Sequence, residues 1–181
     1  MGFALPKDYS PNYTYSDYCQ WEGRWELIDG IPHAMSPQPS GKHQRVCLEL
    51  VSQLRDALSN CNKCEASLPM DWKIGENTVL QPDLFVACFP FIDSKFIDRA
   101  PALVVEVLSP STSTKDLTVK RAIYLDQKVK YYLIMDPDTE EYLVLELNGN
   151  EYIEAAKGHD GKFSFQLEDC VADVDFSTVW K

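Results

Sequence analysis

Two apolar runs constrain this chain most: residues 84–88, Leu-Phe-Val-Ala-Cys, and residues 102–108, Ala-Leu-Val-Val-Glu-Val-Leu. Apolar runs of this length, without alternating polar residues, are typical of central strands that are covered on both faces. A third run lies at 131–135, and a segment that can open a helix at Thr114 and continue to about Asp126 separates it from the second. We therefore predict a mixed α/β domain built on buried strands.

The rest of the chain supplies shorter elements around these strands. Residues 25–31 alternate and turn at Asp29-Gly30, which predicts a hairpin. A loop at 36–41 precedes a helix over 41–59, for which Ser40 is a candidate cap. Residues 70–74 alternate like a strand with one wet face, and short antiparallel strands are expected at 141–147, 151–155 and 163–167. We expect one domain over 1–181, with an N-terminal arm (1–20), a core (21–137) and a β tail (138–181).

Composition limits the class of partner. The 181 residues include 28 Asp or Glu and 17 Lys or Arg, for a formal charge of −11 at pH 7. This acidity argues against a basic protein that coats nucleic acid, since affinity for a phosphate backbone comes mostly from Lys and Arg. No stretch approaches the ~18 apolar residues of a spanning helix, and the start does not resemble a secretory signal, so we expect no membrane partner.

The six cysteines indicate a cytoplasmic protein. They are Cys19, Cys47, Cys61, Cys64, Cys88 and Cys170. Several of the six lie inside predicted elements, which is typical of reduced thiols that act as small core residues. Cys61-Asn-Lys-Cys64 has the spacing of a metal-binding pair. A structural zinc site needs two more ligands, however, and neither a second pair nor a nearby histidine supplies them. We therefore expect two cysteines in a turn.

Glu106 is the most informative residue, because it interrupts a strand that otherwise looks wholly buried. A carboxylate removed from water costs several kcal/mol unless a partner or a metal compensates. Glu106 is therefore either half of a buried salt bridge or a metal-binding or catalytic group.

Three further charged residues join this argument. Asp83 starts the neighbouring strand and would lie near Glu106 if the strands pair, which gives two oxygen donors for a cation such as Mg²⁺. Lys120 shares a helix face with Leu117 and Tyr124 and should point toward the sheet, either to stabilise charge or to extend beside the core. Glu26, between Trp25 and Leu27, is also a carboxylate in an apolar setting, which exposure on the hairpin would explain as well.

Taken together, these residues resemble the Uma-type family of putative restriction endonucleases, within the PD-(D/E)xK nuclease superfamily. The resemblance rests on Pro82-Asp83, on Glu106 within Val-Val-Glu-Val-Leu-Ser-Pro-Ser-Thr, on Lys120-Arg121, and on 131–137, Tyr-Tyr-Leu-Ile-Met-Asp-Pro. The opening hairpin and His43-Gln44 also match, so that the similarity covers roughly residues 15–175.

The resemblance implies a restriction-endonuclease-like αβββαβ core and a nuclease site that uses Mg²⁺ or Mn²⁺. It implies Asp83, Glu106 and Glu26 as metal ligands, with His43 or Gln44 in support. The superfamily pattern places a lysine two residues after the glutamate, where this chain has Leu108, so the resemblance shifts that role to Lys120. DNA would be the substrate and a homodimer the expected assembly.

Charge is distributed consistently with such a site. Residues 113–132 carry a local charge of +3 and the rest of the chain −14, so phosphate contacts can gather around one helix and a bound cation.

Three other classes compete with the nuclease. A catalytically silent relative that binds nucleic acid or a protein fits the displaced lysine and the acidity. A serine or cysteine hydrolase is poorly supported, because the chain has only three histidines and no Gly-x-Ser-x-Gly turn. A dinucleotide site would need a glycine-rich turn after a strand, and there is none.

Overall fold

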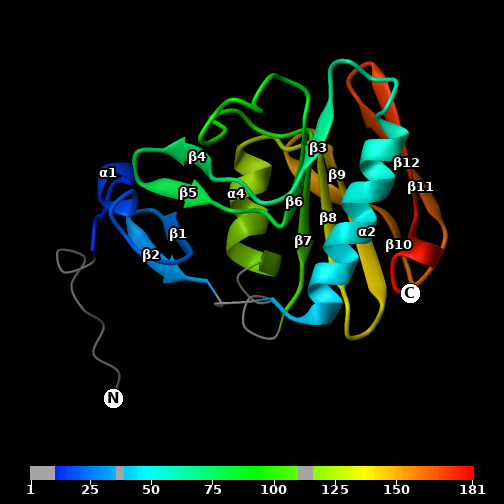
Figure 1. Cartoon of the computed structure of the whole chain (residues 1–181), viewed down its shortest axis with the longest axis horizontal. Helices are drawn as coiled ribbons and strands as arrows, with labels where there is room; N and C mark the ends of the chain where they lie inside the picture. The colour runs from blue at the N-terminus through cyan, green and yellow to red at the C-terminus, as the bar shows by residue number, and fades with distance from the viewer. Residues whose placement is uncertain (1–10, 36–38, 110–115) are drawn as a thin grey trace.

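The computed structural model describes residues 11–35, 39–109 and 116–181, with the backbone alone at 116. Within these ranges a six-stranded sheet has the order β10-β9-β8-β7-β6-β3 (Figure 1). Its strands are β3 (Glu65–Ser67), β6 (Leu84–Ala87), β7 (Leu103–Val107), β8 (Tyr131–Asp136), β9 (Glu141–Asn148) and β10 (Glu151–Gly158). Only β7 and β8 are parallel within it. The mixed α/β fold predicted from the apolar runs is confirmed.

The connection from β7 to the parallel strand β8 passes through a helical crossover. Its described part is a π-helical turn, η2 (Asp116–Lys120), which continues into α4 (Arg121–Asp126). The predicted start of this helix at Thr114 lies outside the described residues, as do residues 36–38 of the predicted loop and residues 1–10 of the arm.

A second, four-stranded sheet contains the predicted hairpin. Its order is β2 (Ile31–Ala34), β1 (Trp25–Ile28), β5 (Thr78–Leu80) and β4 (Trp72–Gly75). The hairpin turns at Asp29 and Gly30, whose φ angles of 49° and 76° suit a tight two-residue turn. The alternation at 70–74 predicted β4 but not β5, which is short and wholly buried and therefore does not alternate.

Two hydrophobic cores lie on opposite faces of the central sheet. Helix α2 (Gly41–Ala57) packs on one face with the hairpin β11 (Lys162–Leu167) and β12 (Cys170–Asp175) and the short helix η3 (Phe176–Thr178). Figure 1 shows α4 on the other face, toward the four-stranded sheet. Trp72 and Tyr124 stack there at 5.8 Å between ring centroids. The predicted tail is thus divided: β9 and β10 extend the central sheet, whereas β11 and β12 cover α2.

The described part of the N-terminal arm packs on the chain itself. Helix α1 (Tyr15–Tyr18) begins with a capping box in which Thr14 and Asp17 bond each other's backbone. The Tyr18 hydroxyl donates to Asp71 at 2.9 Å, and the Tyr15 ring contacts Phe96 edge-on. No helix within the described ranges is long and apolar enough to cross a membrane.

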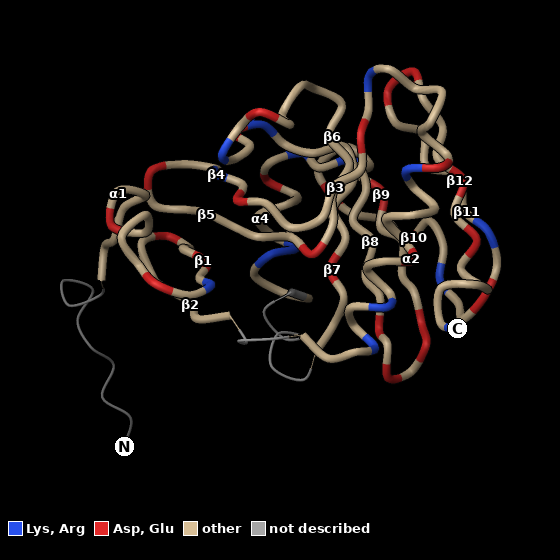
Figure 2. Tube along the Cα trace, in the orientation of Figure 1, with Lys and Arg blue, Asp and Glu red and all other residues tan. Residues whose placement is uncertain are grey.

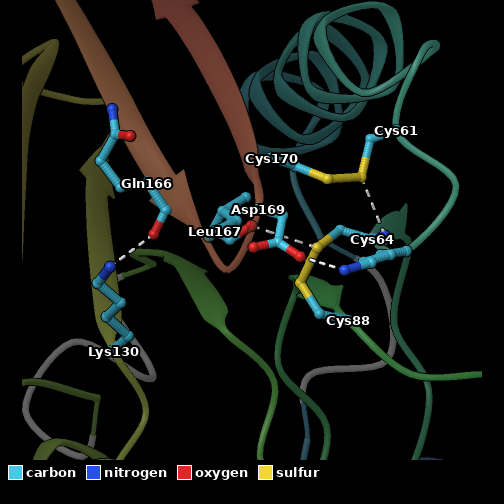
Figure 3. Close-up of a disulfide and its surroundings, with 9 residues drawn as sticks. Cys61, Cys64, Cys88, Lys130, Gln166, Leu167, Asp169 and Cys170 are labelled. Carbon is cyan, nitrogen blue, oxygen red and sulfur yellow. Dashed lines mark hydrogen bonds and ion pairs between the residues drawn. A yellow bond between two sulfur atoms is a disulfide. The ribbon is translucent and has the colours of Figure 1, made fainter.

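The cysteines differ from the prediction of reduced thiols. The structure joins Cys61 to Cys170 and Cys64 to Cys88 as disulfides (Figure 3). These partners are 109 and 24 residues apart, so local spacing could not reveal that folding brings them together. Cys47 is free and buried, as expected of a small core residue, and Cys19 is free and exposed.

Candidate active site

Strand β7 directs Glu106 toward α4 because side chains alternate along a strand. Val105 and Val107 belong to the core beneath α2, whereas Val104 belongs to the opposite core. Glu106 shares the face of Val104 and is only 2% exposed. A carboxylate in this position needs a compensating charge, and the helix packed on that face provides it.

Lys120 supplies that charge and joins two carboxylates. Its Nζ lies 2.9 Å from Glu106 Oε1 and 2.8 Å from Glu26 Oε1, and the side chain is 3% exposed. Glu26 reaches the cluster from β1, is fully buried, and also accepts a hydrogen bond from the backbone N–H of Gln81 at 3.1 Å. One ammonium therefore links the hairpin, the central sheet and the crossover helix.

Tyr124 follows Lys120 by one helical turn and reaches the same oxygen. Its hydroxyl donates to Glu106 Oε1 at 2.5 Å. Burial raises the pKa of Tyr124 well above its ordinary value of 10.0, and the charge of Glu106 raises this pKa further. The phenol therefore stays protonated at neutral pH and acts as a fixed hydrogen-bond donor.

Asp83 directly precedes β6, beside the C-terminal end of the neighbouring strand β7. Leu84 pairs with Val105 across β6 and β7, so the register continues to Asp83 beside Glu106. Asp83 Oδ2 accepts a hydrogen bond from the backbone N–H of Val107 at 2.9 Å, which fixes the carboxylate against the strand. Its side chain is 15% exposed, more than that of Glu106 or Glu26.

His43 contacts the same Asp83 oxygen. Its Nε2 lies 3.2 Å from Asp83 Oδ2, and its Nδ1 lies 3.6 Å from Cys47 Sγ. The ring is held in the first turn of α2, where the Ser40 hydroxyl accepts a hydrogen bond from the His43 backbone N–H. Burial raises the pKa of the Cys47 thiol, with the charges of Asp83 and Glu106 adding to the effect, so Cys47 stays neutral beside the histidine.

Gln44 is placed differently from the other five predicted site residues. It is exposed on α2, and its Nε2 donates to the carbonyl of Pro39 at 3.2 Å. The structure brings Glu26, Glu106 and Lys120 into one cluster and Asp83 and His43 into a second beside it. Sequence reasoning missed the roles of Tyr124 and of the Gln81 backbone; the four-residue spacing from Lys120 could have indicated Tyr124, but nothing in the sequence marks a backbone donor.

The donor set fits a hard divalent cation. Asp83, Glu106 and Glu26 offer carboxylate oxygens, the ligand type preferred by Mg²⁺ and Mn²⁺. Among the described residues, Lys120 contacts Glu26 and Glu106, and His43 contacts Asp83. The register of β6 and β7 puts Asp83 opposite Glu106, so these two carboxylates are the pair that would hold the cation, although the three carboxylates do not form a group with all ligand atoms within 4.8 Å of one another.

Comparison with known proteins gives a family and a fold. Residues 14–177 match the model of the Uma2 family, described as putative restriction endonucleases. The chain is similar to the crystal structure of a putative nuclease belonging to DUF820 from Anabaena variabilis, at 19% identity and a TM-score of 0.75. That match covers 92% of this chain and 97% of the other. No curated protein matches.

At that identity the crystal structure supports the fold alone, whereas the family model spans most of the sequence. The chain belongs to the Uma2 family of putative restriction endonucleases.

Proposed function

We propose that this protein is a metal-dependent endonuclease that hydrolyses phosphodiester bonds of DNA. The observation that carries the proposal is the convergence at the end of β7: Asp83 is held by the Val107 backbone, and Glu106 is held by Lys120 at 2.9 Å. Paired carboxylates beside a buried lysine suit phosphoryl chemistry, in which negative charge must be bound and water oriented. Membership of the family supports the reaction class.

Each residue has a separate task in this proposal. Asp83 and Glu106 would hold the cation, with Glu26 as a third carboxylate. The bound Mg²⁺ or Mn²⁺ would polarise a phosphate oxygen and lower the pKa of a water molecule. Lys120 orients Glu106 and helps to place the attacking water, while Tyr124 keeps the Glu106 carboxylate in one orientation through its hydrogen bond. His43 positions Asp83 from α2.

Asp83→Asn is the sharpest test, because asparagine keeps an oxygen that can accept the Val107 hydrogen bond but removes the charge that would bind the cation. Supercoiled plasmid and single-stranded DNA are incubated with the purified protein and Mg²⁺ or Mn²⁺. We expect cleavage by the wild type, its loss on chelation, and at least about a hundredfold lower rate for Asp83→Asn. Glu106→Gln should lose activity as well.

Glu151→Gln is a matched control, since Glu151 is an exposed carboxylate on β10. It should cleave at the wild-type rate. Because Glu106→Gln disturbs a buried ion pair, Mn²⁺ binding to each variant is measured together with thermal unfolding. Cleavage that survives both Asp83→Asn and Glu106→Gln would contradict the site, and Mn²⁺ binding without cleavage would favour the silent nuclease-fold alternative.

Double-strand cutting suits a two-fold symmetric enzyme, so we also propose that the protein acts on DNA as a homodimer. Light scattering with and without duplex DNA tests the assembly. A monomer under both conditions would exclude the dimer without affecting the hydrolytic site.

A further inference from the structure

Four cysteines from three separate segments meet at the edge of the central sheet, away from the carboxylates. Cys61 and Cys64 lie in the turn between α2 and β3, Cys88 follows β6, and Cys170 begins β12. Cys61 is bonded to Cys170 and Cys64 to Cys88 (Figure 3). The sulfurs of Cys61, Cys64 and Cys170 lie within 4.8 Å of one another, and Cys88 is attached directly to one of them. The two disulfides thus form one compact cluster of four sulfurs.

This cluster has the composition of a tetrahedral metal site. Zinc binds thiolates at about 2.3 Å, which places the four sulfurs about 3.8 Å apart. The sulfurs of Cys61, Cys64 and Cys170 already lie within 4.8 Å of one another, close to that spacing. Cys88, which is bonded to Cys64, would turn its thiol toward these three once the disulfides are reduced. The Cys61-Asn-Lys-Cys64 spacing is typical of two ligands of such a site. Folding brings in Cys88 and Cys170 as the two ligands that the local sequence lacks.

The surroundings also favour thiolate ligands. The backbone N–H of Cys64 donates to Cys61 Sγ at 3.2 Å, and such hydrogen bonds stabilise negative charge on sulfur. Cys61, Cys64 and Cys88 line a cavity of about 790 Å³, through which an ion can reach the sulfurs. Soft sulfur ligands select zinc, whereas the Asp83 and Glu106 carboxylates select Mg²⁺ or Mn²⁺. The two sites therefore differ in metal chemistry.

We propose that Cys61, Cys64, Cys88 and Cys170 bind one Zn²⁺ in the reduced protein, and that the two disulfides are the oxidised form of the same cluster. Two molecules of a trialkylphosphine and two of water convert the disulfides to four thiols and two phosphine oxides. The four thiols then release four protons as they bind Zn²⁺. The metal would tie the α2–β3 turn and the β11–β12 hairpin to the end of β6.

The full-length protein is first reduced with a trialkylphosphine and then incubated with Zn²⁺. Weakly bound zinc is removed before measurement. Elemental analysis should find one zinc per chain, and a pH indicator should report release of about four protons per ion near neutral pH. Co²⁺ in place of zinc should give the visible bands of a tetrahedral thiolate site. Zinc should raise the Tm of the reduced protein and leave that of the oxidised protein unchanged.

Cys88→Ser and Cys170→Ser should weaken zinc binding by at least about tenfold, whereas Cys19→Ser, a matched change at a free exposed cysteine, should not alter it. Asp83→Asn should also retain zinc. Since a cysteine variant can fail to fold, the Co²⁺ spectrum of the wild type provides a readout that needs no substitution. Reduced protein that retains no zinc, or zinc that persists in both Cys88→Ser and Cys170→Ser, would overturn the proposal.

Discussion

Lys120 and Glu106 are 14 residues apart in the chain, yet the Lys120 ammonium lies 2.9 Å from Glu106 Oε1 in a nearly water-free site. The same ammonium lies 2.8 Å from Glu26 Oε1. Two buried carboxylates that share one cation depend on it strongly, because neither has water to replace the charge.

Lys120→Met should therefore lower the free energy of unfolding by about 3–5 kcal/mol, since it leaves Glu26 and Glu106 together without the ammonium. Urea unfolding at neutral pH measures this loss. The double variant with Glu26→Gln should recover part of this loss, because only one of the two carboxylate charges that Lys120 offsets then remains. Lys42→Met, at an exposed pair with Asp138, should change stability by less than about 0.5 kcal/mol. Similar losses for the two lysine variants would contradict the buried network.

Tyr124→Phe should cost about 1–3 kcal/mol at neutral pH, because a buried hydrogen bond to Glu106 is lost. The pKa of Tyr124 is raised in the folded protein by burial and by Glu106. The stability that protonated Tyr124 contributes is therefore complete below about pH 10 and is lost as the pH rises above this value. The unfolded chain then releases the phenolic proton while the folded chain retains it. The stability difference between wild type and variant, measured by urea unfolding from about pH 8 to about pH 11, should narrow as pH rises. A constant difference would show that the Tyr124 proton is not linked to folding.

Ser40→Ala should lower stability by about 1 kcal/mol, because the Ser40 hydroxyl caps α2 through the His43 backbone N–H. This turn carries the His43 ring against Asp83, so plasmid cleavage should also fall, by a smaller factor than in Asp83→Asn. Ser40→Asp, which keeps a capping oxygen, should restore both stability and cleavage. Failure of aspartate to restore stability would argue against the capping role.

Gly30→Ala should destabilise the protein more than Gly149→Ala. Both glycines have positive φ, of 76° and 65°, which costs alanine about 1–2 kcal/mol. A Cβ at Gly30 would also approach the Asn12 backbone to 2.9 Å, whereas one at Gly149 would meet open space. Thermal unfolding of the two variants should separate these contributions, and equal Tm shifts would mean that Asn12 moves aside at little cost.

The sequence predicted those helices and strands whose hydrophobic pattern is long enough to identify them. The apolar runs located β6, β7 and β8, and the helical spacing located α2. The strands β3, β5 and β12 were not predicted, because β3 and β5 have three residues each and β12 alternates on a hairpin beyond the central sheet. Local patterns of that length do not distinguish a strand from a loop.

The sequence revealed those site residues whose charge stands out within an apolar segment. Glu106 stood out because a carboxylate interrupts an apolar strand, and the structure does place it beside Lys120. The contact between His43 and Asp83 depends on how α2 crosses the sheet, and the cysteine pairs depend on segments up to 109 residues apart. Such relationships arise from tertiary packing and have no signature in residue spacing.

The covering of α2 by the last strands also bears on biosynthesis. Gln53 accepts a hydrogen bond from the Asp175 backbone N–H at 2.8 Å, and its Nε2 donates to Thr178 Oγ1 at 2.9 Å. The apolar face of α2 packs against Phe165, Val174, Phe176 and Val179. A chain emerging from the ribosome therefore carries α2 long before the residues that cover it have been made. Completion of this core must wait until translation has passed residue 179, so a nascent chain interrupted earlier would leave α2 open to chaperones.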